Sequence, residues 1–203
     1  MNIVIFGPPG AGKGTQSKFI VQKYKLHQLS TGDLLRNEIK NKTELGNEIS
    51  SIMNSGELVS DKIVGKLIEK FISKDIFKNK IIFDGYPRTI LQAKNLDNLL
   101  EKYNQKIDIV LTLSVSLETV KKRIFERHSQ ENREDDNEDI AIKRYKTYEK
   151  SSKPVIDYYQ KSKLLRVING EVSISEINTE ISGIIEGIKG WLYEITQYKY
   201  ART

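Results

Sequence analysis

A glycine-rich loop between an apolar run and a helical pattern is the feature that most constrains this chain. The apolar run Ile3 to Phe6 leads directly into the loop Gly7-Pro8-Pro9-Gly10-Ala11-Gly12-Lys13-Gly14-Thr15. Because glycine allows positive φ and close backbone approach, successive N–H groups of such a loop can surround an oligophosphate at the positive end of the next helix. Lys13 can then reach the outer phosphates. The spacing and the strand-loop-helix context predict a Walker A loop rather than an ordinary glycine-rich turn.

The metal that accompanies such phosphates is expected at Asp84. This residue ends the apolar run IIFDG, where a Walker B carboxylate would hold Mg²⁺ or its waters. A turn-forming Asp-Gly pair is the alternative, and the Walker A loop favours the metal role. Walker A loops usually place Ser or Thr directly after the lysine to bind the metal, but Gly14 separates Lys13 from Thr15. Direct coordination by the Thr15 hydroxyl is therefore in doubt.

Short apolar runs that alternate with helical patterns predict the fold class. The expected strands are Ile3 to Phe6, Lys80 to Phe83, Ile109 to Leu113 and Leu164 to Ile168. The expected helices cover residues 13–24, 31–41, 44–54, 60–72, 89–103, 116–127, 136–150 and 173–192. This alternation predicts an α/β fold in which helices cover both faces of a parallel sheet.

The length of 203 residues suits a single domain. Residues 30–59 hold two helical patterns in succession, and residues 127–138 are strongly polar. Both segments are expected to project beyond the carboxyl edge of the sheet. The last dozen residues, rich in Tyr and basic groups, are either a final helical turn that packs Trp191 and Leu192 or a loose tail.

Composition restricts the kind of metal and the location of the protein. The chain has no cysteine and only His27 and His128 as soft nitrogen ligands, so a zinc site is not expected and any metal should be held by oxygen. The net charge of +6 favours anionic partners without identifying them. No basic leader segment and no apolar run of membrane-spanning length are present, so a cytoplasmic protein is expected.

A Walker A loop identifies a nucleoside triphosphate as one substrate but does not identify what receives its phosphate. Three segments and their spacing along the chain point to that second substrate: GPPGAGKGTQ from Gly7, STGDLLR from Ser30 and DGYPRT from Asp84. Together they closely resemble the adenylate kinases. The resemblance implies a P-loop NTPase three-layer fold with a five-stranded parallel sheet, and a monomer that moves a phosphoryl group reversibly from Mg-ATP to AMP, giving two ADP. It also implies a monophosphate-binding insertion over residues 30–59, a lid over 122–134 and a C-terminal tail over 190–203.

The resemblance assigns the site residues as follows. It implies an AMP site of Thr31, Arg36, Glu57, Leu58, Val59, Gly85, Tyr86, Pro87, Arg88, Gln92, Arg133 and Arg144. It implies an ATP site of Gly10, Ala11, Gly12, Lys13, Gly14, Thr15, Arg123, Arg127 and Val172. Phosphoryl transfer would depend on Lys13, Arg88, Arg127, Arg133 and Arg144. The chemistry is suitable, because arginine pairs bidentately with phosphate and a glutamine amide can match the Watson-Crick edge of adenine.

The segment after residue 122 is expected to be a short lid. Arg123 and Arg127 lie four residues apart on one helix face, where like charges repel unless an anion lies between them. Only five residues separate Arg127 from Arg133, so the lid would be a short loop. Asp135 and Asp136 would cap the following helix rather than make lid-closing contacts.

Two other functions are possible. UMP/CMP kinases share the loop and the DG-x-PR segment, but Thr31, Thr89 and Gln92 favour AMP as acceptor. A nucleotide-regulated binding module with a basic tail is the second alternative. Lys and Arg are spread over many helices without an aromatic-interleaved patch, so neither nucleic acid nor a membrane is expected as partner.

Overall fold

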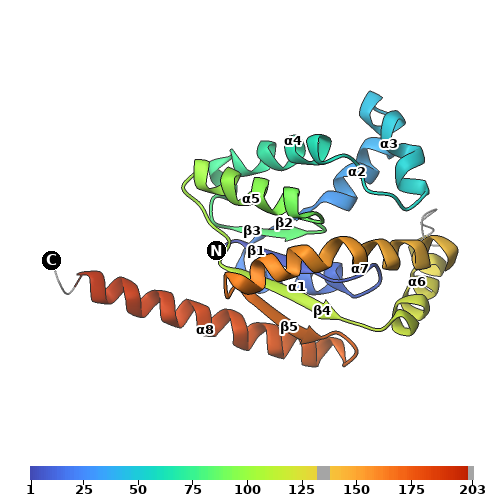
Figure 1. Ribbon diagram of the computed structural model, residues 1–203. Coiled ribbons are helices and arrows are strands. Elements are labelled where there is room, and N and C mark those ends of the chain that lie inside the picture. The colour runs from blue at the N-terminus through green and yellow to red at the C-terminus, as the bar shows by residue number, and fades with distance from the viewer. Residues whose placement is uncertain (132–137, 201–203) are drawn as a thin grey trace.

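The computed structural model describes the backbone of residues 1–131 and 138–200 and the side chains of residues 1–127 and 139–190. Its centre is a five-stranded parallel sheet with strand order β2-β3-β1-β4-β5 (Figure 1). The strands are β1 (Ile3–Phe6), β2 (His27–Ser30), β3 (Ile81–Asp84), β4 (Ile109–Ser114) and β5 (Leu165–Asn169). The predicted α/β fold with a central five-stranded parallel sheet is confirmed.

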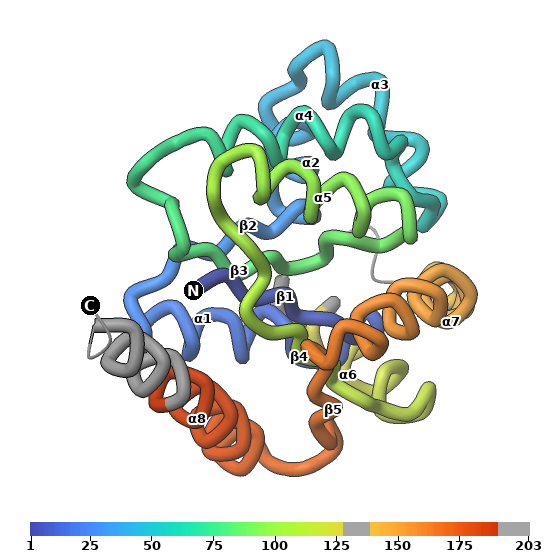
Figure 2. The backbone as a smooth tube through the Cα atoms, turned by 60° about the vertical axis from the view of Figure 1, so that its left-hand side comes forward, coloured from blue at the N-terminus to red at the C-terminus, as the bar shows by residue number. Residues whose placement is uncertain are grey.

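Helices cover both faces of this sheet, with α4 and α5 above it and α1 and α8 below it (Figures 1 and 2). The helices are α1 (Lys13–Tyr24), α2 (Thr31–Lys40), α3 (Glu44–Asn54), α4 (Asp61–Ile72), α5 (Ile90–Lys102), α6 (Leu117–Glu131), α7 (Glu138–Lys161) and α8 (Ile174–Tyr200). A short 3-10 helix, η1, covers Asp75–Phe77. None of the helices, within the described residues, has the length and apolar character that a membrane span requires.

The strands alternate their side chains between two cores. In β1, Val4 and Phe6 enter a core shared with α4, α5 and α7, whereas Ile3 and Ile5 enter a core shared with α1, α6 and α8. This alternation follows from the two-residue period of a strand. Because both faces are buried, β1 consists entirely of apolar residues, which is why the sequence pattern identified it.

The structure corrects the sequence prediction at β2. The segment His27–Ser30 had no strand signal, because only Leu29 of its four residues is buried. β2 lies at the edge of the sheet and pairs with β3 alone, with Leu29 opposite Phe83. A polar sequence is tolerated at an edge position, because one side of the strand faces no neighbouring strand.

Three helices end later than predicted. α6 continues to Glu131 instead of residue 127, and α8 continues to Tyr200 instead of residue 192. α7 continues to Lys161 instead of residue 150, with Pro154 inside it. Val155 and Tyr159 lie beyond this proline and are fully buried in the core above the sheet. Their burial outweighs the local preference of proline for ending a helix.

Gly46 is expected to be essential for the packing of α3 on α2. A Cβ atom at this position would lie 2.1 Å from the carbonyl oxygen of Glu38, a backbone atom that cannot move aside alone. We expect Gly46→Ala to lower the free energy of unfolding by more than about 2 kcal/mol. The matched control is Gly65→Ala in α4, where nothing lies within 4 Å of the added Cβ. That change should raise stability by about 0.5–1 kcal/mol, because alanine favours helix. Urea unfolding measures the change in the free energy of unfolding for both variants. Equal changes for Gly46→Ala and Gly65→Ala would contradict the predicted clash.

Candidate active site

The loop between β1 and α1 forms a turn around the amino group of Lys13. Gly10 and Gly12 have φ angles of 77° and 90°, values that side chains disfavour, and Gly12 is the residue that precedes α1. The Nζ atom of Lys13 donates to the carbonyl oxygens of Gly7 at 2.7 Å and Pro8 at 2.9 Å. The backbone of residues 10–15 thus leads into the amino end of α1, where an anion is favoured.

Asp84 ends β3, the strand beside β1, and lies close to this loop. Its Oδ2 atom accepts a hydrogen bond from Nε2 of Gln28 at 2.9 Å, and the side chain is buried. Burial raises the pKa of the Asp84 carboxyl, and the neighbouring Lys13 ammonium and the Gln28 amide oppose this shift. Gln28 is a site neighbour that the sequence prediction missed, because it lies on the edge strand that had no strand signal.

Cations converge on Lys13 from three parts of the chain. Burial lowers the pKa of Lys13 to about 8, Asp84 raises it, and Arg88, Arg144 and Arg127 lower it further. Arg88 follows β3, Arg127 belongs to α6 and Arg144 to α7. A site in which like charges lower one another's proton affinity gains stability when an anion binds among them.

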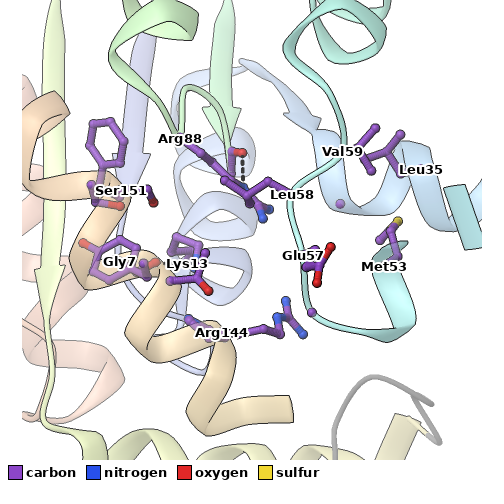
Figure 3. A pocket seen from close by; sticks show the side chains of 18 of the residues that line it. Gly7, Lys13, Leu35, Met53, Glu57, Leu58, Val59, Arg88, Arg144 and Ser151 are labelled. Carbon is purple, nitrogen blue, oxygen red and sulfur yellow. Dashed lines mark hydrogen bonds between the residues drawn. The ribbon is translucent and has the colours of Figure 1, made fainter. Parts of the chain in front are cut away.

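Lys13, Arg88 and Arg144 line one cleft, whose space of about 870 Å³ includes part of the solvent at its mouth. Figure 3 shows Arg88 and Arg144 extending toward the space between α7 and the loop that carries Glu57. The predicted residues that line the cleft are Lys13, Arg36, Glu57, Leu58, Val59, Gly85, Pro87, Arg88 and Arg144. Residues predicted from five separated segments therefore lie on one cavity.

Two predicted residues, Thr31 and Gln92, lie behind this surface instead of lining it. Both are buried, at 2% and 3% exposure. The Thr31 hydroxyl donates to the carbonyl oxygen of Gly85 at 2.9 Å, and Oε1 of Gln92 accepts from the backbone N–H of Arg88 at 2.7 Å. They therefore hold the segment 85–88, whose Tyr86 is also buried and donates its hydroxyl to the Gln92 carbonyl oxygen at 3.2 Å.

The remaining predicted residues lie elsewhere. Arg123 lies on the other side of the glycine-rich loop, where its guanidinium donates to the carbonyl oxygens of Gly170 at 2.8 Å and Ala11 at 3.5 Å. Val172 packs at the edge of the core below the sheet. Arg133, Asp135 and Asp136 lie outside the described residues, as do the side chains of His128, Trp191 and Leu192.

α7 contributes a wall of the cleft that the sequence prediction missed. Besides Arg144, it places Thr147, Tyr148, Ser151 and Ser152 on the lining. They follow Arg144 at three, four, seven and eight residues, and this spacing is the signal that could have identified them, because it puts them on the same helix face. Arg144 also contacts the loop after α3, since a Cβ on Gly56 would lie 3.1 Å from its Cγ atom. The neighbouring Lys143 forms an ion pair with Glu57 at 3.2 Å.

Comparisons with known proteins agree with this architecture. The family model for adenylate kinase matches residues 5–164. A relative from Pelagibacter ubique named adenylate kinase is 41% identical, with 92% of this chain and 100% of the relative covered. Its alignment spans 212 positions, more than the 203 residues here, so the relative contains residues that this chain lacks. A relative of the same name from Flavobacterium psychrophilum is 39% identical over 189 positions, with 93% of this chain and 100% of the relative covered. The chain belongs to the adenylate kinase family.

Proposed function

We propose that the protein transfers the γ-phosphoryl group of ATP to AMP, reversibly, with ADP as both products. The observation that carries the proposal is the convergence of Lys13, Arg36, Arg88 and Arg144 on one cleft beside a phosphate-binding loop. A site for a single triphosphate needs the loop and its lysine. Two further arginines that line the cleft, Arg36 and Arg88, provide for a second phosphate group.

On the donor side, the backbone N–H groups from Gly10 to Thr15 would hold the ATP phosphates together with Lys13. For this, the Lys13 amino group exchanges its carbonyl partners for phosphate oxygens, a stronger interaction between opposite charges. Arg127 would meet the outer phosphates. Arg123 and Val172 would contact the base, a role supported by the position of Arg123 between Ala11 and Gly170.

On the acceptor side, Arg36 and Arg88 would bind the AMP phosphate. Arg36 lines the cleft and forms an ion pair with Asp33, which orients the guanidinium. The base would lie along the segment Glu57, Leu58 and Val59, with Gly85, Tyr86 and Pro87 forming the floor. The side-chain amide of Gln92, buried directly behind this lining, would meet the edge of the base, with Thr31 beside it. Leu35 and Met53 add apolar surface for a planar base.

The reaction requires no general base, because a phosphate oxygen of AMP is already anionic near neutral pH. That oxygen attacks the γ-phosphorus as the bond from the γ-phosphorus to the β–γ bridging oxygen breaks, so the negative charge moves from acceptor to leaving group. Lys13, Arg88, Arg127, Arg133 and Arg144 would align the two nucleotides and stabilise the charge on the transferring group. Closure of the cleft would exclude water as a competing acceptor.

The residues present fit Mg²⁺, which would neutralise phosphate charge when bound with ATP. Asp84 offers a carboxylate at the end of β3, close to the phosphate loop. Among the described residues, no group of three or more His, Cys, Asp or Glu side chains is placed to hold a metal. This donor set suits Mg²⁺, which is commonly bound by one or two carboxylates, water and substrate phosphates. Asp84 would act through water, and no zinc is proposed because the chain has no cysteine.

Residues 30–59 would form the cover over AMP and residues 122–134 a short lid over ATP. The contacts of Gly56 and Glu57 with α7 support the first assignment, since they join the insertion to the opposite wall of the cleft. We further propose a monomeric protein of the cytoplasm, with residues 190–203 as a C-terminal tail and neither nucleic acid nor membrane as partner.

An acceptor panel tests this function. ADP formation is measured with Mg-ATP and, in parallel, AMP, UMP, CMP, GMP or no acceptor. The proposal predicts rapid ADP formation with AMP and little loss of ATP without an acceptor. A preference for UMP or CMP would indicate a UMP/CMP kinase instead. Inactivity with all acceptors would favour a nucleotide-regulated binding module.

Binding of ATP is expected to take up a proton at alkaline pH. The free protein holds Lys13 with a pKa of about 8, and adjacent phosphate oxygens favour the charged ammonium and raise this pKa. At about pH 9, most molecules must therefore protonate Lys13 on binding, and ATP affinity falls as the pH rises above about 8. Titration calorimetry in buffers of different ionisation enthalpy measures the uptake. Lys13→Arg should bind without it, and equal uptake by both proteins would contradict the assignment to Lys13.

A further inference from the structure

The side-chain amide of Gln92 lies between one obligate acceptor and one obligate donor. Its Nε2 atom donates to Oδ1 of Asp61 at 2.6 Å, and its Oε1 atom accepts from the backbone N–H of Arg88 at 2.7 Å. A carboxylate in its charged form can only accept and a backbone N–H can only donate, so these neighbours fix which end of the amide faces which. Because Gln92 is 3% exposed, bulk water does not replace either partner.

Asp61 is itself held in place by the start of α5. It is the first residue of α4, and its Oδ2 atom accepts from the hydroxyl of Thr89 at 3.2 Å. The Thr89 oxygen in turn accepts from the backbone N–H of Gln92 at 3.1 Å, the hydrogen bond that caps α5. Both carboxylate oxygens are therefore directed at one turn, and Asp61 has a defined orientation toward Gln92.

We propose that Asp61 is a specificity-determining positioning residue of the acceptor site, which selects the donor and acceptor pattern of the base through Gln92. This inference rests on the proposed function, in which Gln92 meets the base. An amide has two N–H groups and two acceptor positions. Each end of Gln92 uses one of them, on Asp61 and on Arg88, and has no other partner among the described residues. One donor and one acceptor are left, in a fixed order.

This order distinguishes purines that differ only at their Watson-Crick edge. Adenine presents an acceptor ring nitrogen beside a donor amino group, which matches the free N–H and the free acceptor position of Gln92. Hypoxanthine and guanine present a donor ring N–H beside an acceptor carbonyl, which is the reverse pattern. To match it, the Gln92 amide would have to turn over.

Turning the amide over has a cost at both of its ends. Oε1 would face the Asp61 carboxylate, where two acceptors repel, and Nε2 would face the Arg88 N–H, where two donors meet. A buried polar group left without its partner typically weakens binding by roughly ten- to a hundredfold. Asp61 should therefore contribute about that factor to the preference for AMP over IMP, which has the same sugar and phosphate.

The test compares kcat/KM for AMP and for IMP, with Mg-ATP as donor. The variants are Asp61→Asn, whose amide can turn either end toward Gln92, and Asp61→Leu, which offers neither a donor nor an acceptor. We expect the IMP/AMP ratio of kcat/KM to rise at least about tenfold in both. Asp75→Asn is the matched control, because Asp75 is also an aspartate at the first residue of a helix, η1, but its side chain is exposed. It should leave the ratio unchanged.

The ratio separates specificity from a merely structural role. If Asp61 only stabilised α4, the variants would lose activity with AMP and IMP by the same factor, and an unchanged ratio in both variants would overturn the proposal. A thermal melt of each variant measures any loss of folded protein. Such a loss lowers kcat/KM for AMP and for IMP by the same factor, so it does not change the IMP/AMP ratio. The wild-type protein reports on the proposed function separately, because inactivity with AMP would reject that function before any variant is compared.

Discussion

Replacement of Arg88 by alanine is expected to lower kcat by about 10²–10³-fold while the KM for AMP changes much less. Arg88 lines the cleft, and its Nε atom donates to the carbonyl oxygen of Gly85 at 2.7 Å, which orients the guanidinium. It also lowers the pKa of Lys13, so it lies within electrostatic range of the donor loop. A cation near both nucleotides stabilises charge on the transferring group more than it stabilises either bound nucleotide.

Steady-state kinetics with AMP varied at saturating Mg-ATP measure this effect. Arg88→Lys should recover part of kcat, because it keeps the charge but loses the planar fork. Arg166→Ala is the control for loss of an arginine, since Arg166 is exposed on β5 and, among the described residues, donates to the nearby carbonyl oxygens of Lys163 and Leu165. Equal losses in kcat and in AMP affinity for Arg88→Ala would show ordinary binding instead of transition-state stabilisation.

Replacement of Lys13 by methionine is expected to lower kcat/KM for ATP by about 10³-fold or more. Methionine keeps the apolar stem but removes the cation that faces Asp84 and the loop carbonyls. The phosphates then lose their nearest charge, and the Asp84 carboxylate loses the neighbour that keeps its pKa from rising further. Both changes weaken the binding of ATP and slow the transfer of its phosphoryl group.

Lys18→Met provides the comparison for this variant. Lys18 belongs to the same helix, α1, but its side chain is exposed. The exposed variant should match the wild-type protein in kcat, KM and thermal stability. If Lys13→Met retained more than about a tenth of wild-type kcat/KM, the phosphate-binding role of this loop would be wrong.

Much of the fold could be predicted because its central strands are buried on both faces. β1 is entirely apolar, β3 is apolar up to Asp84, and β4 is apolar apart from Thr112 and Ser114. The apolar side chains of each strand enter two cores. The edge strand β2 gave no such signal, since its polar side chains need no burial. The length of α7 depends on the tertiary burial of Val155 and Tyr159, which local sequence around Pro154 does not reveal.

The charged residues of the candidate site could be predicted from the sequence, but the buried residues that hold them in place through hydrogen bonds could not. Arginines and the glycine-rich loop are recognisable by residue type and spacing, and Lys13, Arg36, Arg88 and Arg144 do line one cleft. The bonds of Asp61 to Gln92 and of Gln28 to Asp84 join residues 31 and 56 positions apart. Such pairs depend on which strand ends and helix starts the topology brings together, and no local pattern encodes that.

The central claim is that the phosphoryl group passes directly between two nucleotides in one cleft. The most direct measurement uses ATP labelled at the γ-phosphorus together with AMP labelled in its adenine. Direct transfer predicts that the phosphorus label appears in the ADP that carries the adenine label, one for each ATP consumed, with almost no inorganic phosphate. Release of labelled inorganic phosphate at the rate of ATP loss would show hydrolysis and contradict the account.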